Sequence, residues 1–275
     1  MTIIFDGREF AREKELQLKK EIEKLREKKI VPKLVSILIG DDAGSKLYLS
    51  LKKKAADRAG CFLDIKKFKE NVDFNELIHQ IENFSKDGKV HGVMVQLPFP
   101  KHFTWDERGE IINSIEPKKD VDGMRDDSPY LTPVVKAVLA ILEESGKISG
   151  KVAVVGASGF VGKKIMKELR TANYELMGYD IDTKNLSGKL LKADIIVSAT
   201  GVPDLIRGGM VKDPPRLASG EAGGAVVIDV GSPKGDVQFN EVSKKASFIT
   251  PVPGGVGPVT IVSLLENLIK SASEK

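Results

Sequence analysis

The sequence predicts an α/β protein of two lobes, each built on a parallel β-sheet. In the first half of the chain, three short apolar runs rich in branched residues alternate with two segments of helical periodicity. The second half repeats this alternation. Strands that helices cover on both faces have nearly continuous apolar sequences, so this order indicates parallel strands joined by right-handed crossovers. A length of 275 residues accommodates two such domains.

The first lobe is expected to follow a βαβαβ order. The expected strands are residues 34–39, 62–68 and 90–97. The first helix is expected to have Ser45 as its N-cap and to end at Gly60. Its apolar arc is expected to contain Leu47, Leu51, Ala55 and Ala59. Asp73 and Glu76 resemble a capping pair that begins the second helix, which ends before Gly88.

The second lobe is expected to contain four strands. They are residues 151–155, 174–179, 193–199 and 225–230. A helix is expected over residues 160–172, and residues 219–224 are typical of a mobile loop. Residues 259–269 have apolar side chains at helical spacing. A helix over residues 133–143 is expected to connect the lobes, which favours a ligand cleft between them.

Composition excludes several classes of protein. The 43 Lys and Arg residues nearly balance the 39 Asp and Glu residues, and the signs are interspersed, so a nucleic-acid partner is not expected. Cys61 is the single cysteine and the three histidines lie apart, which argues against a metal site. No apolar run reaches about 18 residues and the first residues do not resemble a signal peptide. We therefore expect a cytoplasmic protein without a membrane segment.

A glycine-rich turn lies between the first strand and the first helix of the second lobe. Its residues include Gly156, Ala157, Ser158, Gly159, Val161 and Gly162. Glycines allow close approach of a phosphate, and the N-terminus of the helix attracts its charge. The G-x-x-G-x-x-G spacing differs from G-x-G-x-x-G, and an ordinary tight turn is the alternative. The flanking strand and helix favour dinucleotide binding, with Asp180 placed to bond the ribose unless it is only a solvated turn residue.

These features set the expected domain boundaries. Residues 144–258 are expected to form a Rossmann-like, doubly wound dinucleotide-binding domain. Residues 1–143 are expected to form the other domain, and the C-terminal helix, residues 259–272, is expected to return to it.

Tyr48 and Lys52 are the first pair of candidate catalytic residues. They lie four residues apart and therefore on one face of the expected helix. On the helical wheel, Lys52 lies at the border of the apolar arc, where partial desolvation and neighbouring cations would lower its pKa and allow proton transfer. The alternative is a lysine that extends its amine from the edge of a core into solvent, and helix geometry alone favours that reading.

Two loops supply further polar candidates. Gln96 follows a parallel strand, and Asp122 lies in the sequence Lys-Asp-Val-Asp-Gly. Open α/β sheets bind ligands at such loops. Gln96 has both a donor and an acceptor, and Asp122 suits a ring with adjacent N–H groups. Turn capping explains either residue equally well on spacing alone.

The combined motifs resemble the methylenetetrahydrofolate dehydrogenase/cyclohydrolase family. The segment from Pro251 to Thr260, Pro-Val-Pro-Gly-Gly-Val-Gly-Pro-Val-Thr, is nearly identical to the family's C-terminal signature. Tyr48, Lys52, Gln96 and Asp122 match the family's other motifs in chain order. The resemblance spans nearly the whole chain.

This resemblance implies two reactions. The first is reversible oxidation of 5,10-methylenetetrahydrofolate to the methenyl cation with NAD(P), and the second is hydrolysis of that cation to 10-formyltetrahydrofolate. It implies a homodimer that acts on tetrahydrofolate one-carbon derivatives. The implied catalytic residues are Lys52, Gln96 and Asp122. The implied substrate-binding residues are Tyr48, Gln96, Asp122, Pro253, Gly254 and Gly255, and the cofactor-binding set gains Ile181, Thr200 and Gly201.

The cofactor motif departs from the family pattern. The family usually has an arginine that contacts the 2′-phosphate of NADP, where this chain has Ala157. A serine of the family aligns with Ile181, which follows Asp180, and a carboxylate there would repel the phosphate. These residues favour NAD, whereas family habit favours NADP, and Lys163, Lys164 or Lys184 offer alternative phosphate contacts. The segment from residue 123 to residue 133 is also shorter than is typical.

Two other functions compete with this interpretation. One is a dehydrogenase without cyclohydrolase activity, but Lys52 and Gln96 are both retained. The other is a non-catalytic nucleotide-binding protein on the same fold. The retained Tyr48 and Asp122 argue against it.

Overall fold

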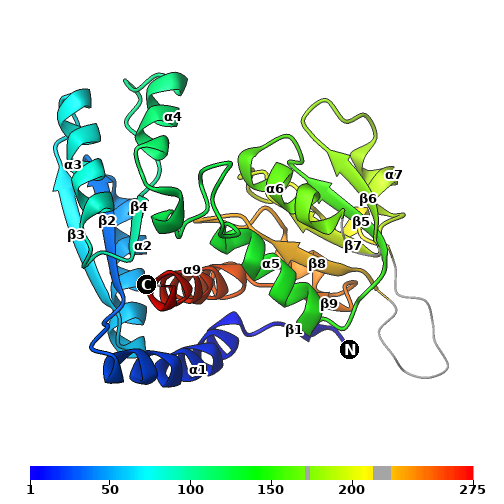
Figure 1. Ribbon diagram of the computed structural model, residues 1–275. Helices are drawn as coiled ribbons and strands as arrows, with labels where there is room; N and C mark the ends of the chain where they lie inside the picture. Colours follow the sequence, from blue (N-terminus) through cyan, green and yellow to red (C-terminus); the bar gives the residue numbers. More distant parts are fainter. Residues whose placement is uncertain (171–173, 213–223, 275) are drawn as a thin grey trace. The chain divides into compact units, whose positions relative to one another are not determined.

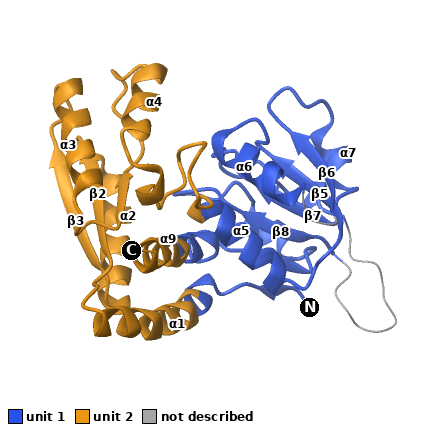
Figure 2. Ribbon diagram, in the orientation of Figure 1, with its two compact units in different colours: residues 1–10, 134–260 blue, residues 11–133, 261–275 orange. Residues whose placement is uncertain are grey.

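The computed structural model describes residues 1–170, 174–212 and 224–274. The chain divides into two compact units, coloured separately in Figure 2. Unit 1 contains residues 1–10 and 134–260, and unit 2 contains residues 11–133 and 261–275. Each unit has its own parallel sheet, so the α/β fold class is confirmed.

Unit 2 is built on a three-stranded parallel sheet of order β3-β2-β4 (Figure 1). Its strands are β2 (Lys33–Ile39), β3 (Phe62–Phe68) and β4 (Gly92–Val95). Its helical segments are α2 (Ala43–Ala59), α3 (Phe74–Lys86), α4 (Trp105–Asn113) and the short 3₁₀ turn η1 (Pro117–Lys119). Most of α1 (Gly7–Glu27) also belongs to this unit. The predicted βαβαβ order is confirmed.

Local capping explains where two of these helices begin and end. Asp73 is the N-cap of α3 and accepts a hydrogen bond from the Glu76 amide, as the sequence predicts. Gly60 ends α2 in the left-handed conformation. The prediction of Ser45 as the N-cap of α2 is wrong. Asp42 is the N-cap, and its carboxylate accepts a hydrogen bond from the Ser45 amide at 2.7 Å.

The last helix, α9 (Val256–Ser273), begins in unit 1 and continues in unit 2 from Ile261. Within unit 2, the Ser271 hydroxyl donates to the His91 carbonyl at 2.6 Å and to the Lys118 carbonyl at 3.0 Å. These contacts attach the helix to the segments before β4 and within η1. Gly92 lies so close to Leu268 that an added Cβ would approach its side chain to 3.0 Å.

Unit 1 is built on a six-stranded parallel sheet of order β1-β9-β8-β7-β5-β6. Its strands are β1 (Ile3–Ile4), β5 (Gly150–Val155), β6 (Tyr174–Tyr179), β7 (Ile195–Ser198), β8 (Val226–Asp229) and β9 (Phe248–Ile249). Its helical segments are α5 (Pro133–Glu144), α6 (Phe160–Leu169), α7 (Leu186–Leu190), η2 (Gly208–Met210) and α8 (Phe239–Val242). Figure 1 shows β5 and β6 beside α6, which packs on both.

The core of unit 1 explains this layering. Side chains from β5, β7, β8 and β9 form one buried cluster with Leu190 of α7 and Val242 of α8. Val152 and Val154 on the other face of β5 are also completely buried. A parallel sheet covered on both faces requires such continuous apolar strands, which is why the sequence identifies them.

The contact-based division differs from the expected boundaries in two places. Residues 1–10 pack with unit 1, because β1 extends the six-stranded sheet beside β9. Residues 134–143, expected in the N-terminal domain, also pack with unit 1. The expected loop at residues 219–224 and the expected helix end at residue 172 fall largely or wholly outside the described residues.

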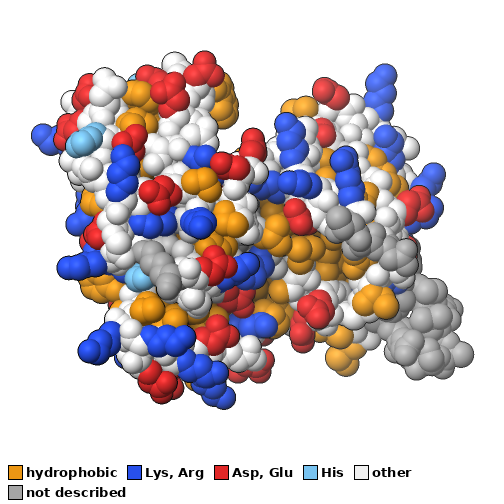
Figure 3. Space-filling model, viewed as in Figure 1, with side chains coloured by type: hydrophobic (Ala, Val, Ile, Leu, Met, Phe, Trp, Pro, Cys, Tyr) orange, Lys and Arg blue, Asp and Glu red, His pale blue; other side chains and the backbone are white. Residues whose placement is uncertain are grey.

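Two broader features of the described chain bear on function. None of its helices is long and apolar enough to cross a membrane. On the face seen in Figure 3, cationic and anionic side chains are interspersed.

Candidate functional site

Lys52 lies on the buried face of α2 and contacts the end of β4. Its side chain is 9% exposed. Its Nζ donates a hydrogen bond to Gln96 Oε1 at 3.0 Å and lies 3.7 Å from Met94 Sδ. Gln96 Nε2 donates to the Leu97 carbonyl at 2.9 Å, so the amide is held at both ends. Lys52 and Gln96, the two residues that the sequence analysis associates with proton transfer, are therefore in direct contact.

The surroundings of Lys52 favour its neutral form. Burial lowers the pKa of its amine, and the negative charge of Asp122 opposes this effect. Desolvation is the larger effect, so a greater fraction of the amine is unprotonated than in a solvated lysine. This electrostatic interaction also links Asp122 to the Lys52–Gln96 pair.

Several contacts hold the loops that carry Gln96 and Asp122. The Gln96 amide continues the pairing of β4 with β2 by donating to the Ile37 carbonyl at 2.8 Å. The Ser45 hydroxyl, at the start of α2, donates to the Leu97 carbonyl at 3.0 Å. Asn267 of α9 donates to the carbonyls of Val121 and Leu131, both at 2.9 Å. Ser45 and Asn267 are supporting residues that the sequence analysis did not identify.

The buried face of α2 differs from the predicted apolar arc. Leu47 and Leu51 are 60% and 42% exposed, whereas Leu49 is 2% exposed. The expected arc is therefore wrong at Leu47 and Leu51 and confirmed at Ala55 and Ala59, and Lys52 lies within the buried face rather than at its border. The interpretation of Lys52 as a lysine that extends into solvent is excluded. Tyr48 lies one turn before Lys52 and is partly exposed.

The glycine turn of unit 1 is closely packed around its own backbone. Gly156 has φ +85°, and an added Cβ would lie 2.5 Å from the Ala199 carbonyl oxygen. A Cβ at Gly162 would lie 2.0 Å from the Gly156 carbonyl oxygen. Gly159 is the N-cap of α6 without a side-chain cap. The turn therefore leaves its first helical N–H groups without a capping side chain, as a pyrophosphate site requires.

Asp180 lies at the end of β6 and contacts this turn directly. Its Oδ1 accepts hydrogen bonds from the amide and the hydroxyl of Ser158, both at 2.8 Å. It is therefore not merely a solvated turn residue. Ile181, the next residue, is 99% exposed, and Val161 is partly buried at the start of α6.

Ala157 and Asp180 line one pocket of about 490 Å³ in unit 1. The remaining lining residues are Ser158, Lys163, Met166, Lys167, Arg170 and Gly178. A Cβ at Gly178 would lie 2.9 Å from Ala157 Cβ, so small residues at both positions shape this pocket. Sequence analysis missed Lys167 and Arg170, although their spacing from Lys163 along α6 was a detectable signal.

The other predicted residues of unit 1 lie in two loops. Thr200 and Gly201 follow β7, and their amides both donate to Asp236 Oδ2. Gly254 has φ +115°, and a Cβ at Gly255 would lie 2.6 Å from the Pro251 carbonyl oxygen. Pro253, before them, is exposed. These positions require glycine for backbone conformation and close packing.

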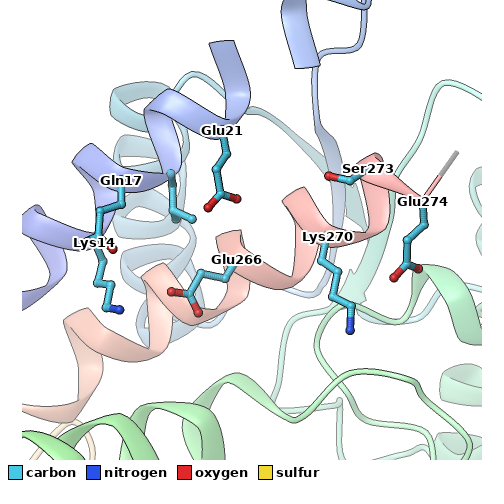
Figure 4. A pocket seen from close by; sticks show the side chains of 8 residues that line it. Lys14, Gln17, Glu21, Glu266, Lys270, Ser273 and Glu274 are labelled. Carbon is cyan, nitrogen blue, oxygen red and sulfur yellow. The ribbon is translucent and has the colours of Figure 1, made fainter. Parts of the chain in front are cut away.

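A separate pocket of about 550 Å³ lies between α1 and α9 in unit 2. Figure 4 shows the lining residues Lys14, Gln17 and Glu21 on α1 and Glu266 and Lys270 on α9. The pocket is lined by both acidic and basic side chains, and none of its residues is a site residue predicted from the sequence. Among the described residues, no group of three His, Cys, Asp or Glu side chains is arranged to hold a metal ion.

The fold and these residues define a class of protein. One unit has a parallel sheet with a glycine turn suited to a dinucleotide, and the other has a buried amine positioned by an amide. This combination is that of a nucleotide-dependent α/β enzyme with a proton-transfer group.

Comparison with known proteins identifies the family. Residues 5–122 match "Tetrahydrofolate dehydrogenase/cyclohydrolase, catalytic domain". Residues 132–275 match "Tetrahydrofolate dehydrogenase/cyclohydrolase, NAD(P)-binding domain". The chain belongs to this family, as the resemblance of its motifs implied.

Individual relatives agree with this assignment over nearly their full length. The chain is 39% identical to the bifunctional protein FolD of Bacillus pumilus over 98% of this chain and 97% of that protein. The crystal structure of the FolD methylenetetrahydrofolate dehydrogenase/cyclohydrolase of Campylobacter jejuni has a TM-score of 0.90 and 36% identity, covering 100% of this chain and 99% of that one. The Trypanosoma brucei enzyme, solved with NADP and an inhibitor, has a TM-score of 0.89 and 29% identity, covering 99% of this chain and 98% of that one.

Proposed function

We propose that this chain oxidises 5,10-methylenetetrahydrofolate with NAD(P) and then hydrolyses the methenyl product to 10-formyltetrahydrofolate. Its family membership supports the reaction pair. The observation that supports specific residues for proton transfer is the hydrogen bond of 3.0 Å that the buried Lys52 amine donates to Gln96. That pair supplies the proton transfer that hydrolysis needs and oxidation does not.

The oxidation depends on alignment. A bound nicotinamide cofactor would supply the hydride acceptor for the methylene carbon, whose two flanking nitrogens would delocalise the resulting positive charge. The chain's part is to hold both reactants. The backbone of the turn from Gly156 to Gly162 would bind the pyrophosphate. The substrate would approach the backbone at Gly254, next to Gly255, because an added Cβ at Gly254 would come no closer than 3.6 Å to the side chain of Arg8.

The hydrolysis depends on Lys52. Water adds through its oxygen to the methenyl carbon, and the neutral amine of Lys52 takes a proton from that water. The ammonium then gives this proton to a folate nitrogen as the bond from that nitrogen to the carbon breaks. The remaining hydroxyl proton of the adduct is lost to solvent, which leaves the formyl group on the other nitrogen and releases one proton overall. Gln96 accepts the hydrogen bond that orients the amine throughout. The electrostatic effect of Asp122 limits how far burial lowers the pKa of Lys52.

Substrate binding is assigned to residues around this pair. Tyr48 is partly exposed one helical turn from Lys52, and its ring stacks on the folate rings. Asp122 accepts hydrogen bonds from the adjacent N–H groups of the pterin. Both assignments rest on the family resemblance and on the grouping of Lys52, Gln96 and Asp122 in unit 2.

The proposed cofactor preference is NAD. Asp180 is held at the end of β6 by two hydrogen bonds from Ser158, so its carboxylate is fixed where a 2′-phosphate would be repelled. Lys163, Lys167 and Arg170 line the same pocket, but all three are exposed and their charges are screened. We therefore expect the carboxylate of Asp180 to have the larger effect on the choice between NAD and NADP.

The preference is tested by kcat/KM for NAD and NADP in the parent and in Asp180→Ser. We expect the parent to favour NAD and the variant to shift toward NADP. Asp182→Ser is the matched control, because Asp182 is an exposed aspartate of the same loop and does not line the pocket. A parent enzyme that strongly prefers NADP would refute the role given to Asp180.

The proton-transfer assignment is tested with Lys52→Met. The variant retains the length of the side chain but has no amine, so we expect loss of methenyl hydrolysis with substantial substrate binding retained. Lys53→Met is the control, because Lys53 is exposed on the same helix. Equal hydrolysis by Lys52→Met and the parent would remove Lys52 from the mechanism, and oxidation without hydrolysis in the parent would identify a monofunctional dehydrogenase.

A homodimer is also proposed, from family resemblance alone. Sedimentation equilibrium of the purified protein tests it. A mass close to twice the 30.0 kDa of one chain supports the dimer, and a mass of one chain contradicts it.

A further inference from the structure

Asp236 is a fully buried carboxylate that the proposed mechanism does not use. It lies in unit 1 between β8 and α8 and has 0% exposure. Its Oδ2 accepts hydrogen bonds from the Thr200 amide at 2.7 Å and the Thr200 hydroxyl at 2.9 Å. It also accepts from the Ser198 hydroxyl at 2.9 Å and the Gly201 amide at 3.3 Å. One oxygen atom therefore holds Ser198, at the end of β7, together with Thr200 and Gly201 of the loop that follows.

That loop borders the glycine turn of the proposed cofactor site. β7 pairs with β5, and the two strands end beside each other in the sheet. An added Cβ at Gly156 would lie 2.5 Å from the Ala199 carbonyl oxygen and 3.2 Å from the Thr200 nitrogen. Movement of Thr200 would therefore displace one wall against which the glycine turn packs.

A second buried carboxylate, Asp229 at the end of β8, fixes the backbone that carries Asp236. Asp229 Oδ1 accepts from the Asp236 amide at 3.0 Å, and Asp229 Oδ2 accepts from the Val237 amide at 2.9 Å. A Cβ at Gly231 would lie 2.6 Å from Asp236 Oδ1, and one at Gly235 would lie 2.5 Å from Asp229 Oδ2. Because Gly231 and Gly235 have no side chains, there is room for the carboxylates of Asp236 and Asp229 beside them.

We propose that Asp236 is a positioning residue for the redox reaction, holding the Thr200–Gly201 segment in the conformation that binds the nicotinamide cofactor. This inference rests on the proposed function, because it takes Thr200 and Gly201 as cofactor-binding residues. A charged acceptor with four donors holds a segment more strongly than a neutral one does. A loop held before the cofactor arrives loses less conformational entropy when it binds.

The test is Asp236→Asn, which keeps the shape of the side chain and removes its charge. We expect its Kd and KM for the preferred nicotinamide cofactor to rise about tenfold. The rate of methenyltetrahydrofolate hydrolysis, measured without added nucleotide, stays within about twofold of the parent because that reaction uses Lys52 in unit 2. Asp204→Asn is the matched control, because Asp204 lies in the same loop and pairs with Lys234 at 2.5 Å. We expect cofactor binding by this control to equal that of the parent.

Ser198→Ala provides an independent test if Asp236→Asn does not fold. It removes one buried donor from Asp236 without touching Thr200 or Gly201, and we expect a rise in cofactor KM of about threefold. Unchanged cofactor binding in whichever of these variants folds would overturn the proposal. An equal loss of cofactor binding and of hydrolysis would also overturn it, since that pattern indicates general destabilisation. A parent that does not oxidise methylenetetrahydrofolate would instead refute the proposed function.

Discussion

Replacing Gln96 with glutamate tests how the surroundings of Lys52 set its protonation. The substitution Gln96→Glu preserves length and shape but places a negative charge at the atom that lies 3.0 Å from Lys52 Nζ. At that distance and an effective dielectric constant of about 20, two unit charges attract by about 5 kcal/mol, equivalent to about four pKa units. Gln96 is only partly buried, so screening by solvent reduces the expected rise to about two units.

The sign of this effect determines the expected pH dependence. Burial lowers the pKa of Lys52, which makes the neutral amine available. Hydrolysis therefore declines as pH falls through that pKa and the amine becomes protonated. Gln96→Glu raises the pKa and should move this decline to higher pH by about two units, with about a hundredfold slower hydrolysis on the acid side. Oxidation should change much less, because it uses no proton from Lys52.

The assay is the pH profile of kcat for methenyltetrahydrofolate hydrolysis, beside the rate of nucleotide reduction. Gln96→Met is the matched control, because it removes the acceptor without adding charge. Its profile should move to lower pH, opposite to that of Gln96→Glu, since the ammonium loses a partner. A Gln96→Glu profile that coincides with the parent's, or that moves to lower pH, would refute this account of Lys52.

Three further predictions concern packing and capping. Gly162→Ala should reduce cofactor affinity at least tenfold, measured by nucleotide titration, because its Cβ would lie 2.0 Å from the Gly156 carbonyl oxygen; unchanged affinity would contradict this. Gly7→Ala should lower the free energy of unfolding, measured by urea denaturation, by about 1–3 kcal/mol, because its Cβ would lie 2.0 Å from the Gly255 carbonyl oxygen. It should also reduce the rate of oxidation. Parental values for both the stability and the rate would contradict this prediction. Thr104→Ala should cost about 1 kcal/mol of stability with both activities retained, because Thr104 forms the capping box of α4; an activity loss larger than the stability loss would contradict it.

Much of the fold follows from apolar patterning. The segments at β2, β5, β7 and β8 are short apolar runs whose residues are mostly buried, which makes them recognisable in the sequence. β1 and β9 have only two residues each and depend on pairing with each other and with β8, so no local pattern indicates them. α1 has many charged residues along its 21 positions, and the patterns described above do not predict it.

The sequence also predicts only part of the candidate site. Helical spacing brings Tyr48 and Lys52 to one side of α2, but it does not specify which face is buried. Leu47 and Leu51 are exposed because Leu49 and Lys52 face the sheet, a choice that tertiary packing makes. The contact between Lys52 and Gln96 joins residues 44 positions apart, so only motif resemblance connects them in the sequence.

The burial and the hydrogen bonds of Asp236 could not be predicted from the sequence. It is one of the 39 acidic residues, and nothing in its local sequence predicts that it is buried or accepts four hydrogen bonds. Its partners Ser198, Thr200 and Gly201 lie more than 30 positions earlier in the chain. Their meeting depends on the parallel pairing of β7 with β8.

The most direct measurement is a time course of one-carbon products from 5,10-methylenetetrahydrofolate and NAD, with the parent and Lys52→Met at equal concentrations. We expect the parent to form reduced nucleotide and 10-formyltetrahydrofolate together, above the rate of hydrolysis in buffer alone. We expect Lys52→Met to reduce nucleotide while the methenyl compound accumulates. Formation of the formyl product by Lys52→Met at the parental rate, or no nucleotide reduction by the parent with NAD or NADP, would contradict the account.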